Sequence, residues 1–267
     1  MADFINTIDL LGDDAVVDSI IDRSITEFKD DQITVVGGYA FRGCAALNEV
    51  DLPNVTELKL GAFANCSALE SVNLPELTTL VNKASYRAES LFSGCTSLRS
   101  ISLPKLTVLT QRMFYGCTAL ESVYLPEADA VGISGGVNYG NALFGNCKSL
   151  KTINLPKVAM LEDAFVSCSA LEVVDLGAVT SIGDAFQKCA ALTTLIIRTS
   201  TIATLKNDAS LSDTLIGSGT GYIYVPAALI DSYKAATNWS TYADQFRALE
   251  DYTVDGTTTG ELDETKI

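Results

Sequence analysis

Residues 39–53 read YAFRGCAALNEVDLP and residues 61–75 read GAFANCSALESVNLP, so one pattern occurs twice near the start of the chain. Five further segments share its frame: SLFSGCTSLRSISLP (90–104), RMFYGCTALESVYLP (112–126), ALFGNCKSLKTINLP (142–156), DAFVSCSALEVVDLG (163–177) and DAFQKCAALTTLIIR (184–198). All seven cysteines of the chain stand in one slot, three residues after a phenylalanine. Because chance does not place every cysteine in one slot, the pattern is an internal repeat.

The repeated apolar positions predict the core. They are Phe41, Cys44, Phe63, Cys66, Phe92, Cys95, Phe114, Cys117, Phe144, Cys147, Phe165, Cys168, Phe186 and Cys189. Consecutive cysteines are 22, 29, 22, 30, 21 and 21 residues apart, so the unit has 21 or 22 residues and two units carry insertions. Such a unit is too short to fold alone, and we expect units to stack with each phenylalanine and thiol over its counterpart.

The end of each unit predicts a short strand. Val50 and Leu52 would face inward and Asp51 outward, and the proline that follows ends the strand. The A-F-x-x-C-x-x-L part has helical spacing, which predicts one or two helical turns on the opposite side. We therefore expect an α/β solenoid with one parallel β-sheet and about seven coils over residues 33–206.

Charged residues support stacking in register. Two repeat positions alternate in sign from coil to coil, namely Asn48, Glu70, Arg99, Glu121, Lys151, Glu172 and Thr193, and Asn54, Glu76, Lys105, Glu127 and Lys157. Coils about 4.8 Å apart would place each acid beside bases. We interpret this pattern as a device that fixes register rather than as a binding site.

The two ends of the chain predict helical caps on the stack. In residues 1–32, four apolar residues share one helical face after a possible N-cap at Asp13: Val16, Val17, Ile20 and Ile21. Residues 207–249 predict a second cap, with a helix from Pro226 to about Ala236 and helical spacing of Trp239, Tyr242, Phe246 and Leu249. Residues 250–267 form an acidic tail, in which Asp255-Gly256 is typical of a hairpin turn and disorder is the alternative.

The composition argues against several classes of site. The chain has no histidine, which removes the usual general base and the commonest zinc ligand. Gly132-Ile133-Ser134-Gly135-Gly136 matches the G-x-S-x-G pattern but has no histidine partner. The cysteines are too widely spaced for zinc and are interpreted as buried free thiols. We predict no metal, no cofactor and no enzymatic activity.

The net charge of −15 argues against nucleic acid and anionic membranes as partners. The acidic excess is concentrated in the ends, since residues 1–31 hold nine acidic and two basic side chains. No apolar run is long enough for a membrane span. The start, MADFINTIDLLGDDAVVDS, lacks the features of a secretory signal, so we expect no leader.

The frame A-F-x-x-C-x-x-L-x-x-V-x-L-P resembles the BspA-type bacterial leucine-rich repeats over about residues 33–206. The stretch GYIYVPAALIDSYKAATNWSTYADQF (221–246) resembles the C-terminal cap of such proteins and of some prophage tail-associated proteins. The resemblance implies a right-handed leucine-rich-repeat coil and a surface or adhesive role without catalysis. It implies a location on the bacterial surface or a phage particle, with the protein in the cytoplasm before release.

Two insertions, VNKASYRAESL (81–91) and VGISGGVNYGNAL (131–143), interrupt the repeat at one point of the unit. Insertions in repeats often mark a binding face, so we predict ligand-binding roles for Tyr86, Arg87, Asn138 and Tyr139, and for Tyr124 at the outward strand position. Neutral loop variation is the alternative. The expected function is recognition of a protein or glycan.

Two alternatives remain. The first is a structural or host-recognition part of a phage tail. The second is a carboxylate-dependent glycan-cleaving enzyme, but its candidate residues Asp51 and Asp175 lie five coils apart, too far to act together.

Overall fold

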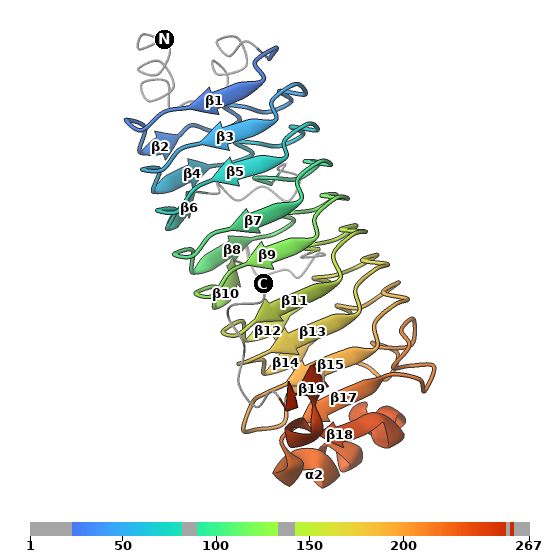
Figure 1. The fold of residues 1–267 in the computed structure, drawn as a ribbon. Helices are drawn as coiled ribbons and strands as arrows, with labels where there is room; N and C mark the ends of the chain where they lie inside the picture. Colours follow the sequence, from blue (N-terminus) through green and yellow to red (C-terminus); the bar gives the residue numbers. More distant parts are fainter. Residues whose placement is uncertain (1–22, 82–89, 133–141, 255–256, 259–267) are drawn as a thin grey trace.

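The computed structural model describes residues 23–81, 90–132, 142–254 and 257–258, which wind into an elongated parallel β-solenoid of about nine turns (Figure 1). The expected number was seven, one for each copy of the motif. Strands β1 and β17 add a turn at either end, and their turns lack the F-x-x-C frame by which the repeats were counted.

One side of the solenoid is a column of parallel strands, the front sheet. Its strands are β1 (Glu27–Lys29), β3 (Glu49–Asp51), β5 (Ser71–Asn73), β7 (Ser100–Ser102), β9 (Ser122–Tyr124), β11 (Thr152–Leu155), β13 (Val173–Leu176), β15 (Thr194–Ile197), β17 (Tyr222–Val225) and β18 (Phe246–Ala248). The register is that of the repeat, with Val50 opposite Val72 and Asp51 opposite Asn73. The middle residue of the three-residue strands from β1 to β9, such as Val50, points into the core, as the alternation predicted.

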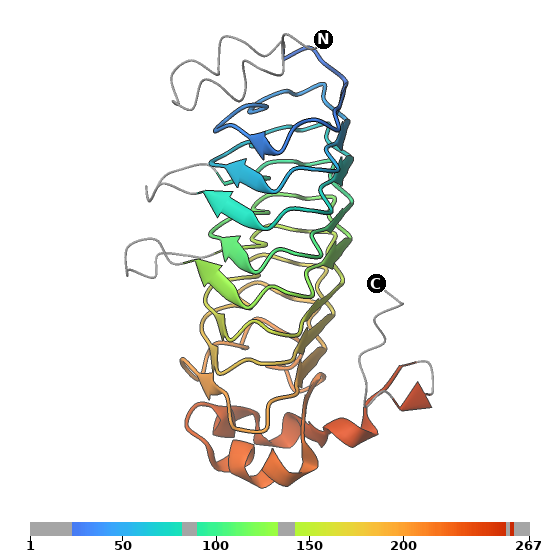
Figure 2. The ribbon, with the colours of Figure 1, turned by 90° about the vertical axis from the view of Figure 1, so that its left-hand side faces the viewer.

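A second column of strands, the side sheet, corrects the expectation of a single sheet (Figures 1 and 2). Its strands are β2 (Val35–Val36), β4 (Glu57–Lys59), β6 (Thr79–Val81), β8 (Val108–Thr110), β10 (Ala130–Gly132), β12 (Met160–Leu161), β14 (Ser181–Ile182) and β16 (Thr204–Leu205). Each has two or three residues, and inward side chains such as Leu58 and Leu161 pack in the core. A strand this short leaves no periodic pattern in a sequence, because the neighbouring coils supply its pairing.

The third side consists of the F-x-x-C turns, and in the described coils these are turns rather than the expected short helices. The Phe41 and Gly43 N–H groups donate to Ala62 and Ala64 of the next coil, both at 2.8 Å. Gly43 has φ +71°, in the left-handed region, and the residue before each of the other six cysteines also has positive φ. Backbone that bonds to the next coil and reverses φ cannot continue a helix.

The predicted core column is confirmed. The seven repeat phenylalanines stack face over face, with ring centroids 5.1–5.8 Å apart and interplanar angles of 2–6°. At the N-terminal end Phe28 meets Phe41 edge to face at 4.8 Å. The seven cysteines are buried free thiols, as predicted.

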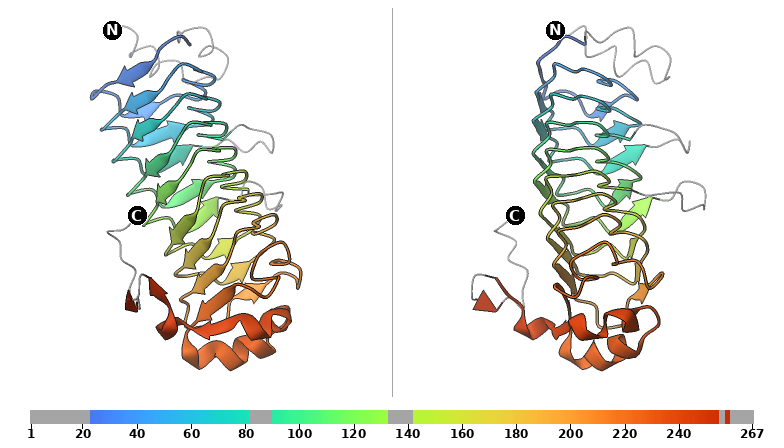
Figure 3. Two further views of the ribbon diagram at one scale, coloured as in Figure 1. Left: turned by 45° about the vertical axis from the view of Figure 1, so that its right-hand side comes forward. Right: turned by 90° about the vertical axis from the view of Figure 1, so that its right-hand side faces the viewer.

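The C-terminal segment lies against the last turn (Figures 2 and 3). Its short helices are η2 (Ala227–Leu229), α2 (Ile230–Ala235), η3 (Trp239–Gln245) and η4 (Leu249–Asp251). Trp239 is buried and its Nε1–H donates to the Ala203 carbonyl oxygen at 2.7 Å, while the Tyr233 hydroxyl accepts from the Ala203 N–H. These bonds fix the segment to the coil that contains β16.

Two expectations about the ends differ from the structure. Trp239, Tyr242 and Phe246 are buried, but they do not share one helix, because η3 is kinked at Tyr242 and Phe246 begins strand β18. Strand β1 lies within the range 1–32 that we expected to be a helical cap, and residues 1–22 lie outside the described residues. The hairpin at the acidic tail is present, with β19 (Thr253–Val254) antiparallel to β20 (Thr257–Thr258).

Candidate functional site

The outward face of the front sheet changes character along the solenoid. At its N-terminal end the outward residues are charged, as in Glu27, Lys29 and Glu49. In the middle they are uncharged, and most of them are small. The outward residues of β5, β7 and β9 are Ser71, Asn73, Ser100, Ser102, Ser122 and Tyr124. The middle of the face therefore differs in chemistry from the acidic chain as a whole.

The middle of the face is hollowed into a groove of about 490 Å³, which we call the serine groove. It is lined by Ser71, Val72, Ser100, Ile101, Ser102, Ser122, Val123 and Tyr124. None of these residues is charged. The hydroxyls of Ser71, Ser100, Ser102 and Ser122 have no hydrogen-bond partner among the described residues. Four hydroxyls and one tyrosine therefore face solvent in a concave, neutral surface.

The groove lies where the front sheet is interrupted. Strands β7 and β9 are joined by ladder bonds, including Leu103 N–H to the Tyr124 oxygen at 3.0 Å. The equivalent bond between β5 and β7 would join the Leu74 N–H to the Ser102 oxygen. In the described part of the chain neither this bond nor any other strand pairing links β5 to β7.

The interruptions coincide with the two insertions. Both sheets are broken between the coils on either side of residues 82–89, and again between the coils on either side of residues 133–141. On the third side the stacking continues, since Phe63 lies 5.5 Å from Phe92 and its N–H donates to Leu91 at 3.0 Å. Strand pairing therefore stops at the coils on either side of both insertions, while the phenylalanine column is continuous.

Ion pairs cross both interruptions and border the groove. Glu76 pairs with Lys105 across the first, and Glu127 pairs with Lys157 across the second at 2.6 Å. On the opposite rim Arg99 and Glu121 pair at 3.1 Å. These pairs come from the two sign-alternating series in the sequence, and they place paired charges on both sides of the groove.

The acidic residues of the front sheet serve structural roles. Asn73 Nδ2 donates to Asp51 Oδ1 at 2.7 Å, and Arg198 binds Asp175 through two hydrogen bonds of 2.8 Å. Asp51 lies on β3 and Asp175 on β13, so they do not form the close carboxylate pair that glycoside hydrolysis needs. Within the described ranges no cluster of three or more acidic or cysteine residues is arranged to hold a metal ion.

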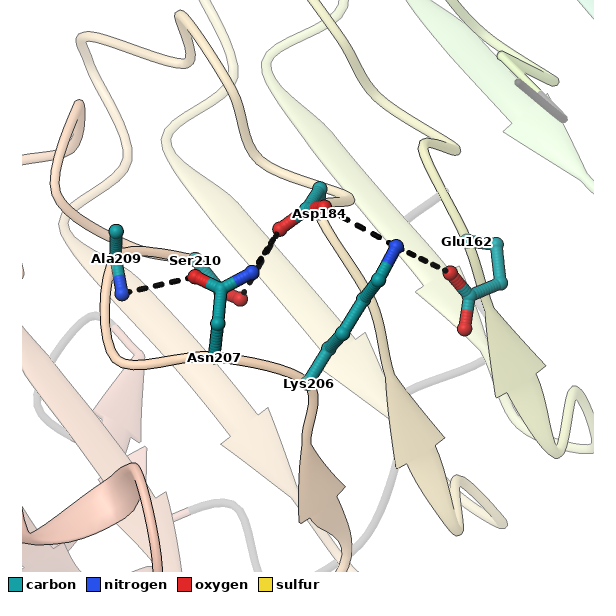
Figure 4. Close-up of polar contacts among 6 residues, drawn as sticks. All are labelled: Glu162, Asp184, Lys206, Asn207, Ala209 and Ser210. Carbon is teal, nitrogen blue, oxygen red and sulfur yellow. Dashed lines mark hydrogen bonds and ion pairs between the residues drawn. The ribbon is translucent and has the colours of Figure 1, made fainter. Parts of the chain in front are cut away.

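A second polar cluster lies on the side sheet after β14 and β16 (Figure 4). Lys206 Nζ lies 3.2 Å from Asp184 and 3.5 Å from Glu162, and Asn207 Nδ2 donates to Asp184 at 2.6 Å. Partial burial acts to raise the pKa of Asp184, but the hydrogen bonds from Asn207 and Lys206 outweigh it and hold the pKa below its usual value. Every charge here has a partner, so the cluster joins the last coils.

The repeat thiols are buried, and burial makes them chemically unreactive. Each thiol from Cys66 onward donates to the phenylalanine carbonyl one coil earlier, as in Cys66 to Phe41 at 2.9 Å. Burial raises the pKa of Cys66 to about 12, with the Cys44 thiol adding to the effect. A thiol with this pKa is a poor nucleophile at neutral pH.

Of the five predicted ligand residues, the structure describes one. Tyr124 is half-buried on β9 and lines the serine groove. Tyr86, Arg87, Asn138 and Tyr139 lie outside the described residues. The serines beside Tyr124 were not singled out from the sequence, although the outward positions of three successive strands carry four serines, and that enrichment was the available signal. No helix of the described ranges has the length and apolarity to cross a membrane.

Comparison with known proteins agrees with this architecture. The family model described as "BspA type Leucine rich repeat region" matches residues 21–135 and 88–215, with six copies. No curated protein matches the chain. A solved structure with the same kind of fold is the leucine rich repeat protein TpLRR of T. pallidum, which is 26% identical, with a TM-score of 0.52 over 62% of this chain and 78% of that one.

Two other solved proteins are more distant. A leucine-rich repeat protein from Bacteroides ovatus is 20% identical, with a TM-score of 0.35 over 68% of this chain and 65% of that one. A leucine rich cell surface protein from Faecalibacterium prausnitzii is 18% identical, with a TM-score of 0.28 over 66% and 60%. The chain thus spans less than two thirds of these two proteins. Because the family model covers more than half of this chain, the chain belongs to the BspA type leucine rich repeat family.

Proposed function

We propose that the protein is a non-enzymatic recognition protein that binds a protein or glycan ligand through the outward face of its front sheet. The observation that carries this proposal is the serine groove, a concave surface of about 490 Å³ on a regular scaffold. Ligand sites are typically concave and largely preformed. Three of its lining residues, Val72, Ile101 and Val123, pack in or against the hydrophobic core, so the groove rests on the core.

The chemistry of the face supports binding without catalysis. The chain contains no histidine, and the serines of the groove have no adjacent base that would activate them. Two of the neighbouring acidic groups are engaged in ion pairs, Glu76 with Lys105 and Glu121 with Arg99. A surface of hydroxyls and one aromatic ring can donate, accept and stack, which are the interactions of recognition.

The test is binding of the full chain to two arrays, one of extracellular protein domains and one of oligosaccharides. Ser102→Arg places a long charged side chain in the groove, and Thr180→Arg places the same side chain on an exposed part of the side sheet. We expect Ser102→Arg to abolish binding and Thr180→Arg to leave it unchanged. Absence of binding on both arrays, or equal effects of the two variants, would contradict the proposal and favour a purely structural module.

A further inference from the structure

We propose that the serine groove takes an uncharged glycan, a ligand class that rests on the proposed recognition function and narrows it. Ser71, Ser100 and Ser102 supply free hydroxyls, and the ring of Tyr124 forms one wall. The groove falls within the roughly 300–1,000 Å³ of typical small-ligand sites, enough for part of an oligosaccharide chain.

Main-chain groups in the groove strengthen the case for a ligand rich in hydroxyls. Between β7 and β9, Ser122 donates to Arg99 and Leu103 donates to Tyr124. The equivalent donors at the first interruption are the N–H groups of Ser100 and Leu74, and they lack these bonds in the described structure. The groove thus combines unpaired backbone donors and acceptors with serine hydroxyls. Sugar hydroxyls both donate and accept, so they match such a mixed set.

A further unpaired acceptor lies on the coil beyond Tyr124. Asn154 occupies the same outward position on β11, across the second interruption, and its Oδ1 is buried without a hydrogen-bond partner in the described structure. A buried amide oxygen is normally paired with protein or water. The outward row from Ser102 through Tyr124 to Asn154 is therefore polar along the solenoid axis, with the Asn154 oxygen itself buried beyond the end of the groove.

The charge of the chain and of the groove argues against acidic ligands. The chain carries a net charge of −15, and the groove contains no basic residue that would bind a carboxylate, sulfate or phosphate. The basic residues at its rims, Arg99 and Lys105, are already paired with Glu121 and Glu76. An anionic glycan would therefore gain no ion pair from the residues that line the groove.

The amino-acid composition of the groove lining argues against a protein ligand at this site. Protein interfaces are enriched in aromatic residues, methionine and arginine and are depleted in serine. The groove has four serines and one aromatic residue. By contrast, a single aromatic ring beside several hydrogen-bonding groups suits a sugar, whose ring stacks on the aromatic face while its hydroxyls are bound around it.

The experiment measures binding of the full chain to immobilised uncharged oligosaccharides of hexose and N-acetylhexosamine units, and to sialylated and uronic-acid oligosaccharides. We expect binding to at least one uncharged probe and to none of the acidic ones. Tyr124→Ala and the double variant Ser100→Ala/Ser102→Ala should each weaken that binding about tenfold. Matched controls on the same face are Tyr222→Ala on β17, a residue that is 39% exposed, and Thr152→Ala on β11.

The controls should bind as the unaltered protein does, and cooperative thermal unfolding of every variant should show that each remains folded at the temperature of the binding assay. Binding confined to acidic probes, or uncharged binding that Tyr124→Ala leaves intact, would overturn the glycan assignment. If only protein domains bind, and Ser102→Arg abolishes that binding, the glycan assignment fails while the recognition function stands. If neither array binds, both fail.

Discussion

The Cys117 thiol lies 3.1 Å from the carbonyl oxygen of Phe92 and donates a hydrogen bond to it. The same contact recurs from coil to coil, so each thiol ties its own turn to the ring column of the turn before. A small side chain with a weak donor fits this slot, because a larger group would not fit between stacked coils. The cysteine in every repeat is therefore explained by packing and one hydrogen bond.

The buried thiols predict a loss of stability at high pH. Burial raises the pKa of Cys66 and Cys117 from 9.0 to about 12. Between these pH values the unfolded chain loses protons that the folded chain keeps, so the free energy of unfolding falls as pH rises. The loss should be about 1.4 kcal/mol per pH unit for each thiol.

Urea unfolding at several pH values between 8 and 11 measures this slope. The double variant Cys66→Ala/Cys117→Ala should show a shallower decline than the unaltered protein, whatever its stability at pH 8. The control Ser169→Ala removes an exposed hydroxyl and should leave the slope unchanged. Equal slopes for all three proteins would mean that these thiols ionise in the folded state as easily as in the unfolded one.

The phenylalanine column predicts position-dependent destabilisation. Phe114 is fully buried, with Phe92 at 5.8 Å and Phe144 at 5.2 Å on its two faces. Phe114→Ala should lower the free energy of unfolding by roughly 3–5 kcal/mol, because it leaves a cavity between two rings. Phe28→Ala, at the half-exposed end of the column, should cost about 1 kcal/mol. Equal losses, measured by urea unfolding, would argue against a cooperative column.

The position before each cysteine predicts a conformational effect. Gly116 has φ +75°, and a Cβ added there would have no heavy atom nearer than 3.9 Å. Gly116→Ala should therefore destabilise by about 1 kcal/mol through backbone strain alone. Lys188 has φ +60° at the same repeat position, and Lys188→Gly should stabilise by about 0.5–1 kcal/mol. Thermal unfolding checks both signs, and a shift of both variants in one direction would contradict this explanation.

The ion pairs predict a contrast between exposed and buried charges. Lys105 and Glu76 are about half exposed, so Lys105→Ala should cost less than about 1 kcal/mol and the cost should shrink in high salt. Arg198 and Asp175 are each 13% exposed and doubly bonded. Arg198→Ala should cost about 3 kcal/mol, because it leaves Asp175 buried without its partner. Unfolding at low and high salt separates the two cases.

The repeat core could be predicted from the sequence because one coil determines the next. Seven phenylalanines in one slot require the column from Phe41 to Phe186, and the structure has it. The side sheet could not be predicted, because strands such as Met160–Leu161 are two residues long and exist through pairing with other coils. Tyr242 shows a similar limit. Its hydroxyl bonds to the backbone of Leu211 and Asp208, and η3 is kinked at this residue despite the helical spacing.

The serine groove is the part of the candidate site that could not be predicted from the sequence. The insertions drew attention to residues within the loops, such as Tyr86. In the structure β5 and β7, the front-sheet strands on either side of residues 82–89, lack the pairing that every repeat pattern implies. That loss depends on how inserted chain is accommodated between coils, which a repeat frame does not encode. Tyr124 was identified from its outward position, whereas Ser100 and Ser102 gained importance only with the interruption.

The backbone amides of four equivalent leucines provide a test of whether the strand pairing is interrupted in solution. Leu52, Leu74, Leu103 and Leu125 are all buried and all precede a proline. The Leu52 and Leu103 N–H groups donate to Asn73 and Tyr124 of the next coil at 3.1 and 3.0 Å. Leu74 and Leu125 stand at the two interruptions and make no such bond in the described structure. Exchange of a buried amide is slowed mainly by its hydrogen bond. The feature that distinguishes Leu74 and Leu125 from the other two leucines is the absence of this bond.

Hydrogen exchange followed by NMR should therefore show the amides of Leu74 and Leu125 exchanging at least about tenfold faster than those of Leu52 and Leu103. The matched burial and the shared proline remove side-chain shielding and local sequence as causes. Equal protection at all four leucines would mean that the strands pair across the insertions in solution. The groove would then lose its unpaired backbone groups, and the argument for a hydroxyl-rich ligand would rest on the serines alone.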